Sequence, residues 1–159
     1  METDAFQLLA DLSAAHPAGY PSLIIQLEHL LAPHVPARLP SGKGAVYVFS
    51  LSAQFGAHSL AGAHRVLKVG KVGPNSNNRF QYQHHSATVA VSTLAASILR
   101  SPVLWPYLGD LHIASDSVGE WMKQHLDRDH FFTAGEDRDL RSMLEVYLRA
   151  RLGPVFEGS

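Results

Sequence analysis

Apolar runs in the middle of the chain predict β-strands. Residues 44–51, Gly-Ala-Val-Tyr-Val-Phe-Ser-Leu, are apolar on both faces, a pattern typical of a central strand. Shorter runs at residues 65–69 and 130–132 predict two further strands. The second run ends at Gly70, where the strand is expected to stop.

Apolar residues at helical spacing predict the remaining elements. The clearest helix covers residues 137–152, where Leu140, Leu144 and Leu148 fall on one side and Pro154 follows the last turn. The other predicted helices cover residues 4–14, 22–31, 78–85, 92–100 and 118–126. From residue 44 onward the predicted order is therefore two strands, three helices, a third strand and a last helix.

The first forty residues form a unit of their own in this pattern. Pro33, Pro36 and Pro40 separate the two N-terminal helical segments from the strands that follow. We therefore expect residues 1–40 to be a helical extension packed on a domain that covers residues 41–159.

Composition places the chain among globular proteins. Its 159 residues are enough for one domain with a core, and 46% hydrophobic against 17% charged residues argues against disorder. No apolar run is long enough to span a bilayer and no signal peptide pattern opens the chain, so we expect a cytoplasmic protein with no membrane partner. The absence of cysteine excludes disulfides and thiolate metal sites.

The charge distribution changes this picture, although the net charge is only −1. No acidic residue occurs between Glu28 and Asp110. The cations in that span are Arg38, Lys43, Arg65, Lys68, Lys71, Arg79 and Arg100. A segment with charges of one sign favours contact with a polyanion such as nucleic acid, although chance clustering on a solvated face would give the same pattern.

Candidate phosphate-binding chemistry follows the second predicted strand. Residues 68–73, Lys-Val-Gly-Lys-Val-Gly, lead through a Pro/Asn loop into a helix that carries Arg79. Backbone N–H groups and cations together favour a phosphate, and a guanidinium can bind two of its oxygens. The segment is not a Walker loop, because no Gly-Lys-Ser/Thr completes it.

Other candidate side chains have competing interpretations. Glu145 lies beside the apolar stripe of its helix and could hold Mg²⁺, but Arg141 and Arg149, each four residues away, could equally pair with it. Tyr47 on a central strand would ordinarily be a core residue. The histidines show no zinc-binding spacing, and no Gly-x-Ser-x-Gly elbow occurs.

Taken in order, these segments resemble the GIY-YIG nuclease superfamily. The first tripeptide would be Ala45-Val46-Tyr47 and the second Lys68-Val69-Gly70. Arg79, His84 and Glu145 stand where the family has its helix arginine, its His or Tyr, and its metal-binding glutamate. The match covers about residues 44–158, with an insertion-like segment near 86–128. It departs from the family pattern at Lys68, where Tyr is usual, and at Glu157, where Asn is usual.

The resemblance implies an α/β (α+β) fold with a small three-stranded, mainly antiparallel sheet, in the order 2-1-3 or similar, flanked by helices. It also implies an endonuclease that hydrolyses phosphodiester bonds in DNA with one Mg²⁺ or Mn²⁺ on Glu145. The expected catalytic residues are Tyr47, Lys68, Lys71, Arg79, His84 and Glu145, and the expected nucleic-acid contacts are Arg65, Lys71, Arg79 and Arg100. A cation at Lys68 or Lys71 would lower the pKa of Tyr47, and His84 would hydrogen-bond Tyr47 or the attacking water.

Several alternatives stay open at this point. The chain could be a nucleic-acid-binding module whose nuclease site has decayed, an RNA-directed nuclease, or a scaffold that binds partners through its N-terminal helices. A nuclease of this kind would fit phage defence or a mobile element. Cutting both strands of a duplex needs two sites, which would favour a homodimer.

Overall fold

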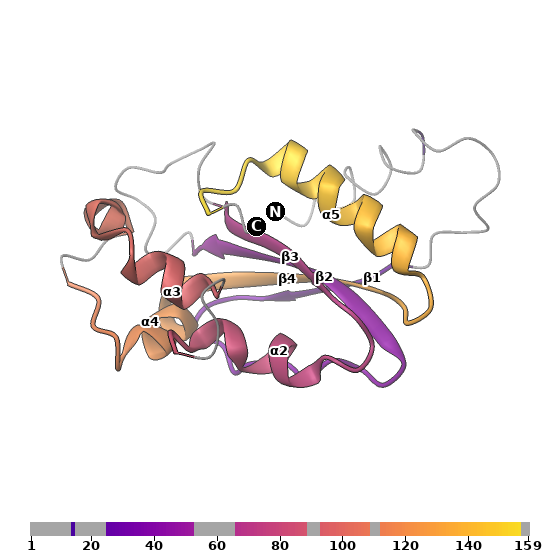
Figure 1. Ribbon diagram of the computed structural model, residues 1–159, viewed down its shortest axis with the longest axis horizontal. Helices are drawn as coiled ribbons and strands as arrows, with labels where there is room; N and C mark the ends of the chain where they lie inside the picture. The colour runs from indigo at the N-terminus through magenta and orange to yellow at the C-terminus, as the bar shows by residue number, and fades with distance from the viewer. Residues whose placement is uncertain (1–13, 15–24, 53–65, 89–92, 109–111, 157–159) are drawn as a thin grey trace.

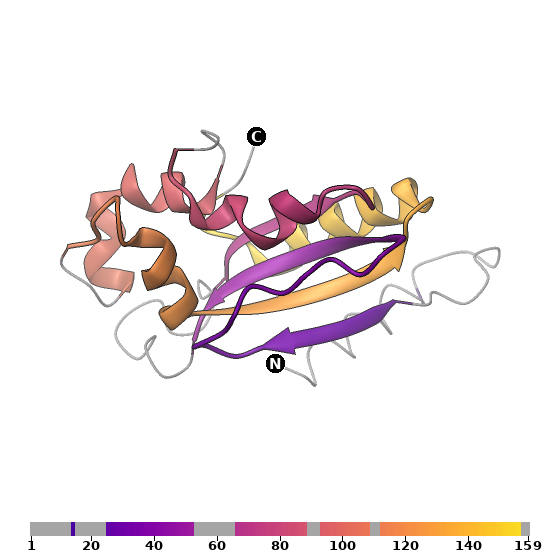
Figure 2. The ribbon, with the colours of Figure 1, turned by 90° about the horizontal axis from the view of Figure 1, so that it is seen from below.

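The computed structural model describes residue 14 and residues 25–52, 66–88, 93–108 and 112–156 (Figure 1). Its centre is an antiparallel sheet of four strands. In spatial order these are β1 (Gln26–Leu30), β4 (Leu126–Ala134), β2 (Lys43–Leu51) and β3 (Val66–Val72). Figure 2 shows the same order, with β1 lowest in the view.

The three strands predicted from the sequence are all present and adjacent. They are β2, β3 and β4, and β2 lies between the other two, as expected of a central strand and of the order 2-1-3. The expected count of three is wrong, because β1 adds a fourth strand outside β4. The fold class is therefore α+β, with a four-stranded antiparallel sheet flanked by helices.

The helices cover both faces of the sheet (Figure 1). One face carries α2 (Asn77–Gln81), the 3-10 turn η1 (Gln83–His85), α3 (Leu94–Leu99), the 3-10 helix η2 (Pro102–Leu108) and α4 (Val118–His125). Among the described elements, α5 (Arg138–Leu152) covers the opposite face. These elements confirm the helices predicted from residue 78 onward, and η2 is an addition to them.

Two cores form because alternate residues of β2 point to opposite faces. Tyr47 and Phe49 pack with Phe80 in the core under α2, α3 and α4. Val46 and Val48 belong to the second core, together with Leu144 and Leu148 of α5. Burial on both faces explains why this strand is apolar throughout.

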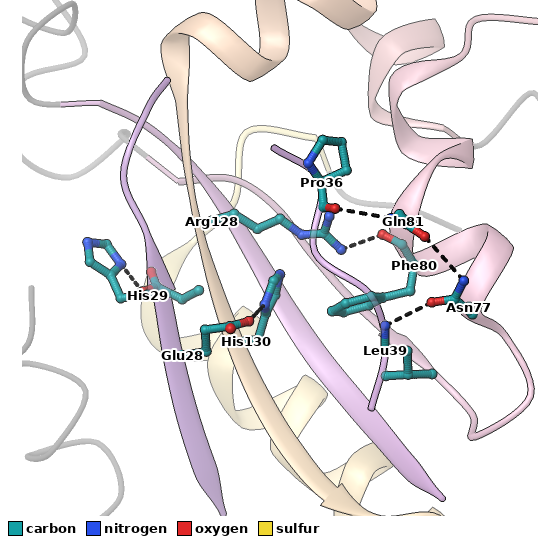
Figure 3. Close-up of polar contacts among 10 residues, drawn as sticks. Glu28, His29, Pro36, Leu39, Asn77, Phe80, Gln81, Arg128 and His130 are labelled. Atoms are coloured by element: carbon teal, nitrogen blue, oxygen red, sulfur yellow. Dashed lines mark hydrogen bonds and ion pairs between the residues drawn. The ribbon is translucent and has the colours of Figure 1, made fainter. Parts of the chain in front are cut away.

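The predicted helix over residues 22–31 is wrong, because residues 26–30 form β1. Its leucines fit a helical face, but the backbone pairs with β4 along its whole length. Two cross-strand polar contacts accompany this ladder: Nδ1 of His29 lies 2.5 Å from Oδ1 of Asp129, and Nδ1 of His130 lies 2.7 Å from Oε2 of Glu28 (Figure 3). Pairing of this kind outweighs local propensity. The predicted helix over residues 4–14 lies outside the described residues, apart from residue 14.

Side-chain hydrogen bonds fasten the chain before β2 to helix α2 (Figure 3). The backbone N–H of Leu39 donates to Oδ1 of Asn77 over 2.8 Å, and Nε2 of Gln81 donates to the carbonyl of Pro36 over 3.2 Å. Nδ2 of Asn77 also donates to Oε1 of Gln81. These bonds therefore hold the short helix that carries Arg79 against the chain that precedes β2.

Arg128 holds the same helix from the sheet. Its side chain is fully buried, and Nη2 donates to the carbonyl oxygen of Phe80 over 2.5 Å (Figure 3). The guanidinium lies over the rings of Phe80, Phe49 and Tyr47, with centroid distances of 4.3, 5.0 and 5.8 Å. These cation–π contacts offset part of the cost of burying the charge. Burial lowers the pKa of Arg128 to about 10, so it stays protonated at neutral pH.

The segment after α5 covers the beginning of the edge strand β3. Gly153 ends the helix in the left-handed conformation, with φ of 55°. The backbone N–H groups of Val155 and Phe156 then donate to the carbonyls of Val66 and Leu67 over 3.0 and 2.8 Å. This tail pairs with β3 just before Lys68. The pairing explains why the segment Pro154-Val155-Phe156 follows the last helix so closely.

Candidate functional site

Tyr47 of β2 and Gly70 of β3 face each other across the sheet. They are register partners, and a Cβ atom at residue 70 would lie 2.3 Å from the Tyr47 hydroxyl. Only glycine leaves room for the hydroxyl at this position. The two tripeptides singled out in the sequence thus meet through one contact between the tyrosine and the glycine.

Glu145 of α5 reaches β3 from the opposite face of the sheet. Its Oε2 lies 3.0 Å from Nζ of Lys71, and its Oε1 lies 3.0 Å from Nη2 of Arg149. Lys71 is the register partner of Val46, whose side chain belongs to the core under α5. Glu145 and Tyr47 therefore contact successive residues of β3, but from different faces.

Four cations surround this part of β3. Burial lowers the pKa of Lys68, and the charges of Arg79, Arg149 and Arg100 lower it further, in that order. The arginines come from α2, from α5 and from the C-terminal end of α3. Lys68 itself is only 5% exposed. Cations gathered in this way raise the local positive potential, which the carboxylate of Glu145 offsets in part by pairing with Arg149. Such a potential favours a bound anion.

The expected lowering of the Tyr47 pKa is wrong. Burial raises the pKa of Tyr47 to about 12, and Arg79 provides the largest opposing charge. Lys71, which pairs with Glu145, is not among the charges that oppose this shift. At neutral pH the tyrosine is therefore a protonated hydrogen-bonding group, not a phenolate. The charges of Glu145 and Arg149 also act on its hydroxyl, so the two faces of β3 remain coupled electrostatically.

His84 packs against Tyr47 without the expected hydrogen bond. The two ring centroids are 4.6 Å apart at an interplanar angle of 55°, and both imidazole nitrogens are buried without a partner among the described residues. Burial, followed by the charge of Arg128, lowers the pKa of His84 to about 2. The ring is thus a neutral wall of the tyrosine pocket.

Three of the residues considered in the sequence remain: Lys71, Arg141 and Arg65. Lys71 binds Glu145 and Oγ of Ser142, so in this structure it contacts the glutamate. Arg141 does not pair with Glu145 but donates to the carbonyls of Ala134 and Gly135. Arg65 lies outside the described residues.

Arg149 is a functional candidate that the sequence does not single out. The sequence predicts it as a surface partner of Glu145, and that i,i+4 pair does form. The same guanidinium also donates to the carbonyl of Val69 over 3.4 Å and acts on Lys68 and Tyr47. The four-residue spacing between Glu145 and Arg149 is the sequence signal that could have identified it.

A divalent ion would have one carboxylate available here. The described part of the chain contains no group of three or more His, Asp or Glu side chains arranged to hold a metal. Mg²⁺, however, is commonly held by one or two carboxylates with waters and substrate phosphates completing its shell. The Glu145 side chain is 10% exposed, and its two oxygens pair with Lys71 and Arg149, so it would offer an oxygen to such an ion only after Lys71 moves away.

Comparison with known protein families, with curated proteins and with solved structures finds no match to this chain. Within the described residues, no helix has the length and apolar character needed to cross a membrane.

Proposed function

We propose that the protein is a divalent-cation-dependent endonuclease of GIY-YIG type that hydrolyses phosphodiester bonds in DNA. The observation that carries the proposal is that three features contact neighbouring residues of β3, with Tyr47 and Glu145 on different faces of the sheet. The three features are the Tyr47 hydroxyl against Gly70, the carboxylate of Glu145, and the cation cluster around Lys68. Residues about a hundred positions apart in the chain supply them.

The cations suit the binding and stabilisation of a phosphoryl group. Arg79 is exposed on α2, and its guanidinium can bind two phosphate oxygens of an incoming backbone. A guanidinium placed there would stabilise the charge that develops during cleavage. Arg100 and Arg149 add positive charge. Contacts of such cations with phosphate have no preference for base sequence.

Lys68 is better suited than Tyr47 to accept the proton of the attacking water. Its pKa is lowered by burial and by three guanidinium groups, whereas burial raises the pKa of Tyr47. A base works best when its pKa lies near the working pH. The protonated Tyr47 hydroxyl would then orient the water.

Glu145 would hold a divalent ion, which when bound supplies Lewis-acid stabilisation of the leaving oxygen. Arg149 orients the carboxylate, since it bridges Oε1 of Glu145 and the carbonyl of Val69. The proposed phosphate contacts are made by cations, which do not distinguish DNA from RNA. DNA is therefore proposed from the family resemblance, and RNA is tested beside it.

The test is cleavage of supercoiled plasmid with Mg²⁺, Mn²⁺ or EDTA, repeated with single-stranded RNA. Glu145→Gln should abolish nicking, whereas Glu136→Gln, in the exposed turn between β4 and α5, should cleave as the wild type does. Intact plasmid and intact RNA with every divalent ion would refute the proposal. Equal cleavage by the two variants would refute the role of Glu145.

One observation favours a second function, nucleic-acid binding without cleavage. Both carboxylate oxygens of Glu145 are already held by cations, as in a purely structural ion-pair network. In that case a labelled duplex would bind with steep salt dependence, Glu145→Gln would leave its affinity unchanged, and neither protein would cut it.

A further inference from the structure

The two cations on Glu145 are held in different ways. Nζ of Lys71 lies 3.0 Å from Oε2 and 3.0 Å from Oγ of Ser142, and the lysine side chain is 40% exposed. Arg149 lies one helical turn after Glu145, contacts Oε1 at 3.0 Å and also reaches the carbonyl of Val69 on the sheet. Arg149 is therefore anchored to the backbone, whereas the contacts of the Lys71 ammonium among the described residues are with side chains.

Lys71 is also the cation that can leave at lower cost. A lysine ammonium is a strongly hydrated point charge on a flexible stem, and its exposed position allows rehydration. Ser142 does not depend on it, because the serine hydroxyl also donates to the carbonyl of Arg138. Releasing Lys71 thus breaks two side-chain contacts and leaves the helix and strand unchanged.

A divalent ion on Oε2 of Glu145 would be repelled by the charge of Lys71, whose Nζ lies 3.0 Å from the same oxygen. Mg²⁺ binds carboxylate oxygens at about 2.0–2.1 Å, so two like charges would meet on Oε2. An arriving phosphate removes the conflict, because it adds negative charge and offers Lys71 a new partner.

We infer that Lys71 competes with the divalent ion for the carboxylate of Glu145. The lysine pairs with this carboxylate until a substrate phosphate arrives together with the metal. The inference rests on the proposed function, whose metal it places on the same carboxylate. It gives the site a regulatory property: the ion binds weakly to the free protein and tightly only when nucleic acid is present.

The experiment measures Mn²⁺ binding to the full-length protein without nucleic acid, by titration calorimetry and by the decrease of the free Mn²⁺ electron paramagnetic resonance signal. Lys71→Met and Lys71→Gln, which remove the charge, should bind Mn²⁺ at least tenfold more tightly than the wild type. Lys71→Arg keeps the charge and should bind as weakly as the wild type. Adding Glu145→Gln to Lys71→Met should abolish the gain.

Unchanged or weaker Mn²⁺ binding by both charge-removing variants would overturn the inference, and so would a gain that survives Glu145→Gln. Urea unfolding of each variant checks that the edge strand remains intact, and two different replacements guard against a fault peculiar to one. Tighter binding in variants of a protein that cuts no nucleic acid would support the competition and refute the nuclease. Cleavage by the wild type without any gain in Lys71→Met would refute the competition alone.

Discussion

Replacing Gly70 with alanine tests the contact between the two strands of the candidate site. The added Cβ would lie 2.3 Å from the hydroxyl oxygen of Tyr47 and 2.6 Å from Cζ, whereas ordinary contact begins at 3.4 Å. The ring or the strand must therefore shift by about 1 Å, and neither has room. Tyr47 is 1% exposed and packs on Phe49, Phe80 and His84, while β3 is paired to β2. Overpacking of this kind costs about 1–3 kcal/mol.

Gly73→Ala is the matched control, because a Cβ at residue 73 meets nothing within 4 Å. We expect urea unfolding to place Gly70→Ala about 1–3 kcal/mol below the wild type and Gly73→Ala within about 0.5 kcal/mol of it. Displacing the Tyr47 hydroxyl by about 1 Å should also reduce cleavage about 100-fold. Equal stability of the two alanine variants would refute the close contact on which the site depends.

Three further predictions follow from the charges around β3. Burial lowers the pKa of His84 to about 2 while an unfolded histidine titrates at 6.5, so below pH 6.5 the unfolded state binds more protons and stability falls. His84→Phe lacks this penalty, so between pH 7.5 and 5.5 its free energy of unfolding should gain about 1.4 kcal/mol relative to the wild type. Parallel curves of unfolding free energy against pH for the two proteins would contradict the buried neutral ring. Arg100→Ala should weaken duplex binding and reduce the slope of log affinity against log salt by about one, as measured by fluorescence anisotropy, and an unchanged slope would exclude a phosphate contact. Tyr47→Phe should fold normally yet cleave about 100-fold more slowly, whereas full activity would remove the hydroxyl from the mechanism.

Much of the sheet could be predicted because β2 is buried on both faces and therefore apolar throughout. Helix α5 was equally clear, since Leu140, Leu144 and Leu148 repeat at helical spacing. The strand β1 could not be predicted in this way. Its leucines satisfy a helical pattern, and the contacts of Glu28 and His29 with β4 join residues about a hundred positions apart.

The structure brings several of the predicted site residues to β3, but their arrangement there could not be predicted. Charge pattern and glycine spacing indicate Lys68 and Arg79, and the family resemblance indicates Glu145, but the sequence does not show which face of β3 meets α5. Lys71 is predicted as a phosphate contact, whereas in the structure it binds Glu145. Arg128 carried no signal at all, because a buried arginine between two aspartates looks like an exposed polar strand in sequence.

The central claim is that the cations and the carboxylate gathered at β3 act on one scissile phosphate. Single-turnover cleavage of a labelled DNA duplex, with protein in excess and saturating Mg²⁺, tests it most directly. Arg79→Ala should bind the duplex more weakly than the wild type, as the loss of one phosphate contact requires, and at saturating protein should still cleave it about 10²–10³-fold more slowly. Arg138→Ala, which changes an exposed residue at the start of α5, should cleave at the wild-type rate. A duplex left intact by the wild type, or cut equally fast by both variants, would contradict the account.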